Sequence, residues 1–179
     1  MKQPKKLEGM IGFWKSEIAK RTSLVCYRYE AGEKEIAAVN ICSVKSIDDA
    51  TEDSTKEDDM DDDLSCLVNT VNYMSDKADL YETMDVREYL TGYGLLVVPK
   101  FRGNRLGAKV LAARESMCRL LGVKGTATLF TGVASQKLAA RAGFTTAVDM
   151  SFAELADLGF VFPGNPHERI KLMKQRYLH

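Results

Sequence analysis

The stretch GLLVVPKFRGNRLGAKVL, residues 94–111, decides the fold of this chain. Its apolar beginning, Leu95–Val98, is typical of a buried strand, and Pro99 ends that strand because proline has no N–H to donate to a sheet. A basic turn with two glycines follows and leads directly into a helical pattern that starts at Leu106. The first N–H groups of a helix lack partners within the helix and carry together about half a positive charge. A strand, a turn and a helix in this order therefore predict a loop that binds an anion.

The side chains of the turn favour phosphate as that anion. Arg102 and Arg105 supply guanidinium groups, whose planar donors suit phosphate oxygens. Gly103, Gly107 and Ala108 are small enough for a phosphate to approach the backbone. The predicted anion-binding residues are Arg102, Gly103, Asn104, Arg105, Leu106, Gly107 and Ala108.

This turn resembles the pyrophosphate-binding loop of GCN5-related N-acetyltransferases (GNAT), which reads Gln or Arg, two residues, Gly, one residue, then Gly or Ala. Arg102 matches the first position and Gly107 the last, whereas Arg105 stands where the family has its first glycine. The resemblance implies that acetyl-CoA binds here with its pantetheine chain along the strand. It also implies that backbone N–H groups of the strand stabilise the oxyanion; the residues concerned are Leu95, Leu96 and Val97. Four consecutive apolar residues are equally typical of any buried central strand.

The second half of the chain is similar to one group of that family, the arthropod arylalkylamine N-acetyltransferases. The residues that carry the similarity are Ser135-Gln136-Lys137-Leu138, Ala142-Gly143-Phe144 and Phe162-Pro163. Many other acetyltransferases have a tyrosine four residues before the Gly-Phe pair, where this chain has Ala139. The resemblance implies instead that Ser135 protonates the departing thiolate, with Thr131 as a second hydroxyl. A helix N-cap is the alternative role for Ser135, and a structural role is favoured for Thr131.

Acetyl transfer also requires a base, because an alkylammonium with a pKa of about 10 is mostly protonated at pH 7. The carboxylates Glu8, Glu17, Asp85 and Glu88 are candidates without a supporting motif, so the base stays unassigned. His167 has a side chain that titrates near neutrality, but a histidine in a polar loop is more often a surface residue.

The composition limits the partners. Lys plus Arg equals Asp plus Glu at 25 each among 179 residues, so the overall charge favours neither nucleic acid nor an anionic membrane. No apolar run approaches the roughly 20 residues of a membrane span, and no secretion signal is visible. Four widely spaced cysteines without a CxxC pair predict reduced thiols and no metal site, and therefore a cytoplasmic protein.

An acidic block interrupts the chain between Asp48 and Asp63. Asp58–Asp63 is a poor calcium loop, because it lacks the glycine at the sixth position and the glutamate at the twelfth that an EF-hand needs. We interpret residues 47–63 as a mobile acidic insertion within a single domain that spans residues 1–179.

The hydrophobic periodicity predicts ten elements of secondary structure, including the strand and the helix on either side of the basic turn. Helices are expected at 7–21, 64–80, 106–121 and 135–142, and strands at 23–29, 35–44, 92–98, 127–130, 144–152 and 170–177. This order predicts an α/β (α+β) fold in which helices flank a mixed, twisted sheet of the GNAT type, apparently without the family's first strand and first helix.

The function that these observations predict is acetyl-CoA-dependent transfer of an acetyl group to a primary amine, such as an arylalkylamine of the dopamine, serotonin or tyramine type. The alternative is a catalytically degenerate or truncated GNAT-like protein that binds CoA without transferring the acetyl group. A nucleotide-dependent enzyme is disfavoured, because neither GxxxxGK[ST] nor GxGxxG occurs in the chain.

Overall fold

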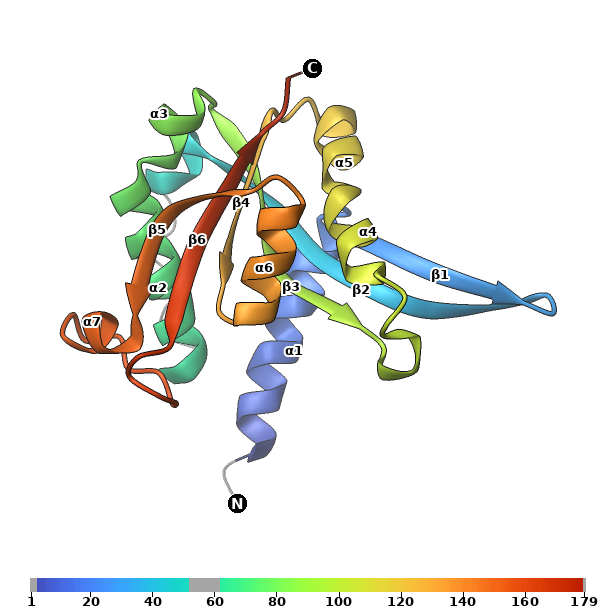
Figure 1. The fold of residues 1–179 in the computed structure, drawn as a ribbon, viewed down its shortest axis with the longest axis horizontal. Coiled ribbons are helices and arrows are strands. Elements are labelled where there is room, and N and C mark those ends of the chain that lie inside the picture. The colour runs from blue at the N-terminus through green and yellow to red at the C-terminus, as the bar shows by residue number, and fades with distance from the viewer. Residues whose placement is uncertain (1–2, 52–61, 179) are drawn as a thin grey trace.

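A computed structural model describes residues 3–51 and 62–178 of the protein. It contains a six-stranded sheet with helices on both faces (Figure 1). The elements, in chain order, are α1 (Gln3–Ala19), β1 (Leu24–Glu30), β2 (Glu33–Ser46), the 3-10 helix η1 (Ile47–Thr51), α2 (Asp62–Ala78), α3 (Leu80–Met84), β3 (Glu88–Val97), the 3-10 helix η4 (Pro99–Phe101), α4 (Leu106–Ala112), α5 (Arg114–Leu121), β4 (Gly125–Phe130), α6 (Val133–Arg141), β5 (Thr145–Ser151), α7 (Phe152–Ala156) and β6 (Arg169–Arg176).

The strands lie in the order β1-β2-β3-β4-β6-β5. Neighbouring strands are antiparallel except β3 and β4, which run parallel in the middle of the sheet. The β1–β2 hairpin extends beyond the rest of the molecule (Figure 1). This mixed sheet confirms the predicted fold class.

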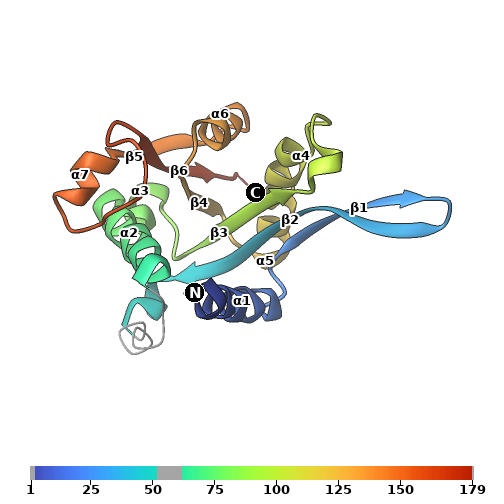
Figure 2. The same ribbon diagram turned by 90° about the horizontal axis from the view of Figure 1, so that it is seen from below.

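Figure 2 shows the helices in two layers, with α1 and α2 on one side of the sheet and α4 and α6 on the other. The packing of buried side chains agrees with these layers. Met74 of α2 packs with Ala127 of β4 and Leu172 of β6 in one cluster. Leu111 of α4 and Ala139 of α6 belong to a second cluster on the opposite face. The hydrophobic face of each helix therefore fixes it to the sheet, and with it the loops at the strand ends.

Most element ends lie one to four residues from the predicted ones, and three differences go further than that. The helix expected at 106–121 is divided at Ala113 into α4 and α5, although it ends at Gly122 as expected, with φ 72°. Two short helices, α3 and α7, were not predicted. Each is capped by an acidic or hydroxyl side chain, Asp79 for α3 and Ser151 for α7, and such caps stabilise even single turns of helix. Phe152 consequently starts α7 and does not extend the preceding strand.

Only the two ends of the predicted acidic insertion are described, and its last two residues, 62 and 63, begin α2. Residues 47–51 form η1, and Asp48 pairs with Arg87 at 2.9 Å. Residues 52–61, which contain most of the calcium-loop alternative, lie outside the described residues. None of the described helices combines the length and the hydropathy that a membrane span requires.

Candidate active site

The two parallel strands at the centre of the sheet are paired over a short distance only. Their ladder comprises Leu90 with Thr126 and Thr91 with Ala127, after which the strands diverge. On its other edge β3 stays paired with β2 as far as Val97. From Gly92 onward, the edge of β3 that faces β4 therefore makes no backbone ladder with β4. Ligands of α/β proteins bind at such carboxyl ends of parallel strands.

The register shows which backbone groups face this divergence. The N–H of Val98 donates to the carbonyl of Ala37 on β2 at 2.9 Å. Successive residues of an antiparallel pair face alternate edges, so the backbone of Leu96 faces β2 and that of Leu95 and Val97 faces the divergence. The carbonyl of Val97 accordingly accepts a hydrogen bond from Arg102 Nε at 3.2 Å. This geometry favours Leu95 and Val97 over Leu96 as donors to an oxyanion.

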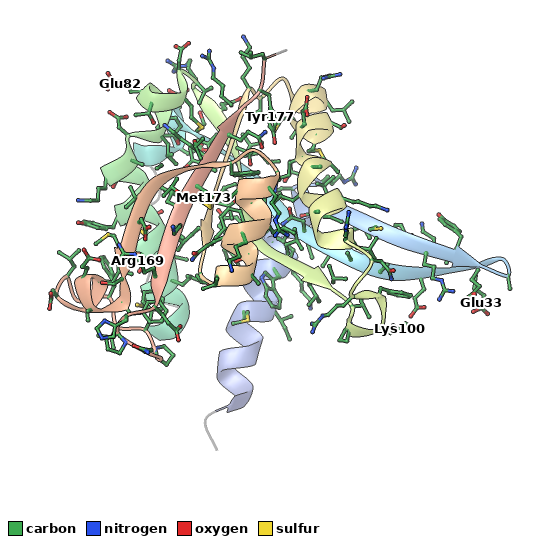
Figure 3. All side chains as sticks on the ribbon, viewed as in Figure 1. Glu33, Glu82, Lys100, Arg169, Met173 and Tyr177 are labelled. Carbon is green, nitrogen blue, oxygen red and sulfur yellow. The ribbon has the colours of Figure 1, made fainter. Side chains whose placement is uncertain are left out.

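The predicted anion-binding loop follows η4, and Lys100 marks its position in Figure 3. Residues 102–105 are exposed. Gly103 has φ 84°, and Arg105 caps the N-terminus of α4 with φ 55° and ψ 23°. A left-handed backbone at the position of the family's first glycine explains why that position favours glycine. No side chain caps α4, so the N–H groups at its start face a ligand without a competing partner.

Gly107 lies at the start of α4 and faces β3. A Cβ at this position would lie 3.7–3.8 Å from the side chains of Leu95, Val97 and Leu138, which is ordinary van der Waals distance. Packing therefore does not require glycine here, and the predicted role of Gly107 in the anion-binding loop stays a prediction. The charges of the loop remain available, because within the described part of the chain neither Arg102 nor Arg105 pairs with a carboxylate.

The two hydroxyl candidates lie at the end of β4, across the divergence from the loop. Thr131 is exposed and lies between β4 and α6. Ser135 occupies the third position of α6, and its hydroxyl donates to the carbonyl of Gly132 at 2.8 Å. Gly132 is the N-cap of this helix, so the alternative that Ser135 is the N-cap was wrong.

Gln136 is a further residue of this region that the sequence did not single out. Its side chain is buried and donates to the carbonyl of Phe130 at 3.0 Å and to that of Arg169 at 2.7 Å. These bonds tie the start of α6 to the ends of β4 and β6, and they fix the place of the neighbouring Ser135. The sequence signal that could have identified Gln136 was its position as a polar residue directly after the candidate catalytic Ser135.

A buried polar cluster lies where the β3–β4 ladder ends. Arg114 is 1% exposed, and its guanidinium donates to Asn40 Oδ1 at 2.8 Å and to Thr128 Oγ1 at 2.6 Å. Gly92 leaves room for it, since a Cβ there would come within 1.9 Å of Arg114 Nη2. The sequence contains a signal for the burial of Arg114, which continues the apolar stripe of Val110 and Leu111 at helical spacing, but none for its partners.

The base candidates do not gather at the divergence. Glu17 is 6% exposed on α1, where both of its carboxylate oxygens accept hydrogen bonds from Lys20, at 2.7 and 2.9 Å. Glu88 begins β3, nine residues before Val97, which places it roughly 30 Å from the loop at about 3.3 Å per residue. His167 is exposed. The side chain of Glu8 is not described, and the base stays unassigned.

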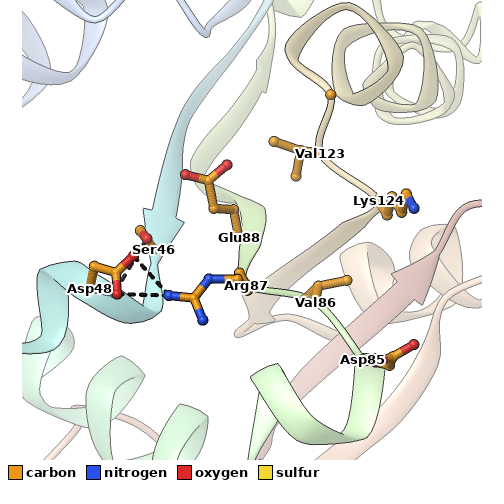
Figure 4. A pocket seen from close by; sticks show the side chains of 9 residues that line it. Ser46, Asp48, Asp85, Val86, Arg87, Glu88, Val123 and Lys124 are labelled. Carbon is orange, nitrogen blue, oxygen red and sulfur yellow. Dashed lines mark hydrogen bonds and ion pairs between the residues drawn. The ribbon is translucent and has the colours of Figure 1, made fainter.

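Two hollows in the surface show which of these residues lie near the anion-binding loop. One, of about 350 Å³, contains Asp85 and Glu88 at the ladder's closed end, beside the Asp48–Arg87 ion pair (Figure 4). The other, of about 560 Å³, adjoins the anion-binding loop and is lined by residues that include Asn104 and Leu106. Only the second of these two is near the predicted site.

The two buried cysteines do not provide a nucleophile. Cys42 and Cys118 are both buried. Burial raises the pKa of the Cys42 thiol, against the opposing effect of the nearby Arg114 guanidinium. Burial likewise raises the pKa of Cys118 to about 12. Both side chains are therefore neutral thiols at pH 7.

Comparison with solved structures identifies the family. The protein assigned as arylalkylamine N-acetyltransferase 7 of the yellow fever mosquito Aedes aegypti is 32% identical to this chain, with a TM-score of 0.82 over 95% of this chain and 70% of that protein. The chain belongs to the arylalkylamine N-acetyltransferase group of the GNAT family. This N-acetyltransferase shares its fold with two more distant proteins. The polyamine N-acetyltransferase of Drosophila melanogaster has a TM-score of 0.73 at 21% identity, over 92% of this chain and 79% of that protein. A NatB acetyltransferase complex bound to CoA has a TM-score of 0.55 at 8% identity, over 94% and 82%.

No protein-family model and no curated protein sequence matches this N-acetyltransferase. The family assignment therefore depends on the structural comparison and on the loop and serine motifs. It confirms the predicted family and its enzymatic class.

Proposed function

We propose that this N-acetyltransferase transfers the acetyl group of acetyl-CoA to a small primary amine. One observation carries the proposal: the free edge of β3 leads directly to the start of α4, which no described side chain caps, and to Arg102 and Arg105, which pair with no carboxylate among the described residues. The amide chain of pantetheine has donors and acceptors that match the free edge of a strand. A diphosphate matches the amides at the start of α4 together with the Arg102 and Arg105 guanidinium groups.

The chemistry follows from this placement. The thioester carbonyl lies beside Leu95 and Val97, whose amides stabilise the negative charge of the tetrahedral intermediate. The neutral amine attacks the carbonyl carbon, its nitrogen gives up one proton to water, and the tetrahedral intermediate collapses as the C–S bond breaks. The Ser135 hydroxyl turns from the Gly132 carbonyl to donate a hydrogen bond to the departing thiolate, directly or through water, and thereby assists protonation of the thiolate by water. Thr131 follows the same end of β4 and supplies a second hydroxyl beside Ser135.

The acceptor that we expect first is an arylalkylamine. The mosquito protein at 32% identity bears that assignment, whereas the polyamine N-acetyltransferase resembles this chain in fold alone. The amine acts as a nucleophile only in its neutral form, so turnover should rise with pH toward the amine's pKa of about 10.

Measurement of free thiol released from acetyl-CoA tests this proposal. The assay uses a panel of dopamine, serotonin, tyramine, agmatine and spermidine. We expect release that depends on an amine, and binding of CoA in calorimetry without binding of ATP or NAD. Arg102→Glu should weaken CoA binding about tenfold or more, because it replaces a cation by an anion beside the diphosphate.

Each component of the proposal has an outcome that contradicts it. CoA binding without amine-dependent thiol release would establish the alternative of a catalytically degenerate CoA-binding protein. Unchanged CoA affinity in Arg102→Glu would show that the diphosphate binds elsewhere. Arg141→Glu, an exposed reversal on the last turn of α6, is the matched control for a general change of surface charge.

A further inference from the structure

The β3–β4 ladder ends at a side chain that is inserted between the two strands. The N–H of Gly92, the residue after the last ladder pair, does not reach a β4 carbonyl. It donates instead to the hydroxyl oxygen of Thr128 at 3.2 Å. That hydroxyl in turn donates to the carbonyl of Ala127 at 2.8 Å. A backbone-to-backbone hydrogen bond is thus replaced by a relay through one oxygen atom.

An inserted hydroxyl separates the strands while keeping them connected. A direct N–H···O bond spans about 2.9 Å, whereas a relay through a hydroxyl places two such distances in sequence. The strands must therefore stand further apart at Gly92 than at Thr91, and they diverge beyond that point. Glycine at position 92 is required here, because a Cβ would lie 3.2 Å from Thr128 Oγ1 as well as against Arg114.

Arg114 holds this hydroxyl in place. Its 2.6 Å bond to Thr128 Oγ1 is the shortest of the buried cluster. The same guanidinium donates to Asn40 Oδ1, and Asn40 Nδ2 donates to the carbonyl of Gly94 at 2.7 Å. Arg114 thus connects Thr128 of β4 to Asn40 of β2, and Asn40 continues the connection to Gly94 of β3. The register of β2 and β3 shifts at this same place, between Ile41 and Cys42.

The cluster is costly to bury, which favours a role beyond stability. Arg114 is 1% exposed, and its partners among the described side chains are amide, hydroxyl and thiol groups without a carboxylate. A guanidinium stays charged in proteins, and burial of a charge without a counter-ion is unfavourable unless its hydrogen bonds are well satisfied. Apolar residues would fill the same space at lower cost.

We propose that Thr128, held by Arg114, is a positioning residue that keeps β3 and β4 apart and thereby creates the unpaired β3 edge on which the pantetheine chain binds. This inference depends on the proposed function for the identity of the ligand, but the separation of the strands does not. The two parts can accordingly be tested separately.

The test compares Thr128→Val with Thr126→Val. Thr126 is a matched control, because it is also a buried β4 threonine and its hydroxyl also accepts from Arg114, at 3.3 Å. Its own hydrogen bond, however, goes to the carbonyl of Leu90 within the closed ladder. Both variants lose one buried hydroxyl of equal size. Both should therefore unfold at a lower urea concentration than the wild type. Thr128→Ser keeps the hydroxyl and is the conservative rescue.

Two readouts separate positioning from stability. Calorimetry should show that CoA affinity falls about tenfold in Thr128→Val and stays within about twofold of the wild type in Thr126→Val and Thr128→Ser. Amide hydrogen exchange followed by NMR, without ligand, should show at least about tenfold faster exchange at Gly92 in Thr128→Val alone, because that N–H loses its buried acceptor. Equal behaviour of the two valine variants in both readouts would overturn the inference, as would an unchanged Gly92 in Thr128→Val.

Failure of the proposed function gives a different result. If the wild type binds no CoA, the ligand assignment is wrong, and the exchange rate of Gly92 still decides whether Thr128 separates the strands.

Discussion

Substitutions of Arg105 should change the stability of the protein and its affinity for CoA independently of each other. Its backbone has φ 55° and ψ 23°, and the left-handed region costs a residue with a Cβ roughly 1–2 kcal/mol. Glycine avoids that cost but loses roughly 0.4–1 kcal/mol through the greater freedom of the unfolded chain. Arg105→Gly should therefore be more stable than Arg105→Ala by roughly 0.5–1 kcal/mol, since both variants lack the guanidinium and only alanine keeps the strain.

Urea unfolding measures this difference. With a slope of about 2 kcal/mol per molar urea, the midpoints of the two variants should differ by roughly 0.3–0.5 M at unchanged slope. CoA affinity should instead follow the charge: both variants lose the cation and should bind CoA about fivefold more weakly, an effect that shrinks at high salt. Arg105→Lys keeps the charge and the strain, so it should retain most of the affinity.

Two results would refute this reasoning. Equal midpoints for the glycine and alanine variants would show that position 105 is not held in the left-handed region. Stronger CoA binding by Arg105→Gly than by the wild type would show that the shape of the loop, and not the charge of Arg105, limits access of the diphosphate.

Three further predictions concern other parts of the molecule. Ser135→Ala should lower the turnover number in the thiol-release assay more than it lowers CoA affinity; equal losses in both would contradict a role in chemistry. Gly92→Ala should lower the free energy of unfolding by about 2 kcal/mol, because its Cβ would lie 1.9 Å from the buried Arg114 guanidinium, and an unchanged urea midpoint would contradict that packing. Partial burial raises the pKa of Asp149, but hydrogen bonds from basic side chains of β6 outweigh it and hold the pKa below its ordinary value of 3.8. That stabilisation is present above about pH 4 and is lost as pH falls through the lowered pKa, so Asp149→Asn should cost about 1 kcal/mol at pH 7 and converge with the wild type near about pH 2; a constant difference across this range would refute the ion pair.

The fold was predictable from local patterns because each long element has a clear apolar period and a clear end. Gly122 ends the helix after the anion-binding loop in the left-handed conformation that glycine favours. The short helices α3 and α7 were not predictable in the same way. Five residues contain too little periodicity, and their existence depends on a single capping contact, such as the reciprocal bonds of Ser151 and Glu154.

The candidate site was predictable where it is made of consecutive residues. The loop from Arg102 to Ala108 depends on backbone groups in sequence order, so its pattern survives in the sequence. The interpretation of individual positions was less secure. Gly107 faces β3, where a Cβ would make ordinary van der Waals contacts, whereas Arg105 carries the strain that the family avoids with glycine.

The polar cluster was not predictable, because its members come from four separate elements. Asn40 lies 74 residues from Arg114, and no local period relates the two. Each of these polar residues looks alone like a surface residue or a weak point in an apolar stripe. Only the meeting of β2, β3 and β4 gives them a common role.

The contrast between the predictable loop and the unpredictable polar cluster has a physical origin, which also connects the two proposals. In the two proposals, backbone groups bind the diphosphate and the pantetheine, and they can do so only where the sheet leaves them unpaired. A sheet leaves backbone groups unpaired in its interior only when something prevents pairing, since unmade backbone hydrogen bonds are unfavourable. In this protein the Thr128 hydroxyl and the Arg114 guanidinium occupy the place of the next ladder bond. In the two proposals taken together, the loop motif explains where the charged end of CoA binds, and the buried polar cluster explains why a strand edge is free to bind the rest of it.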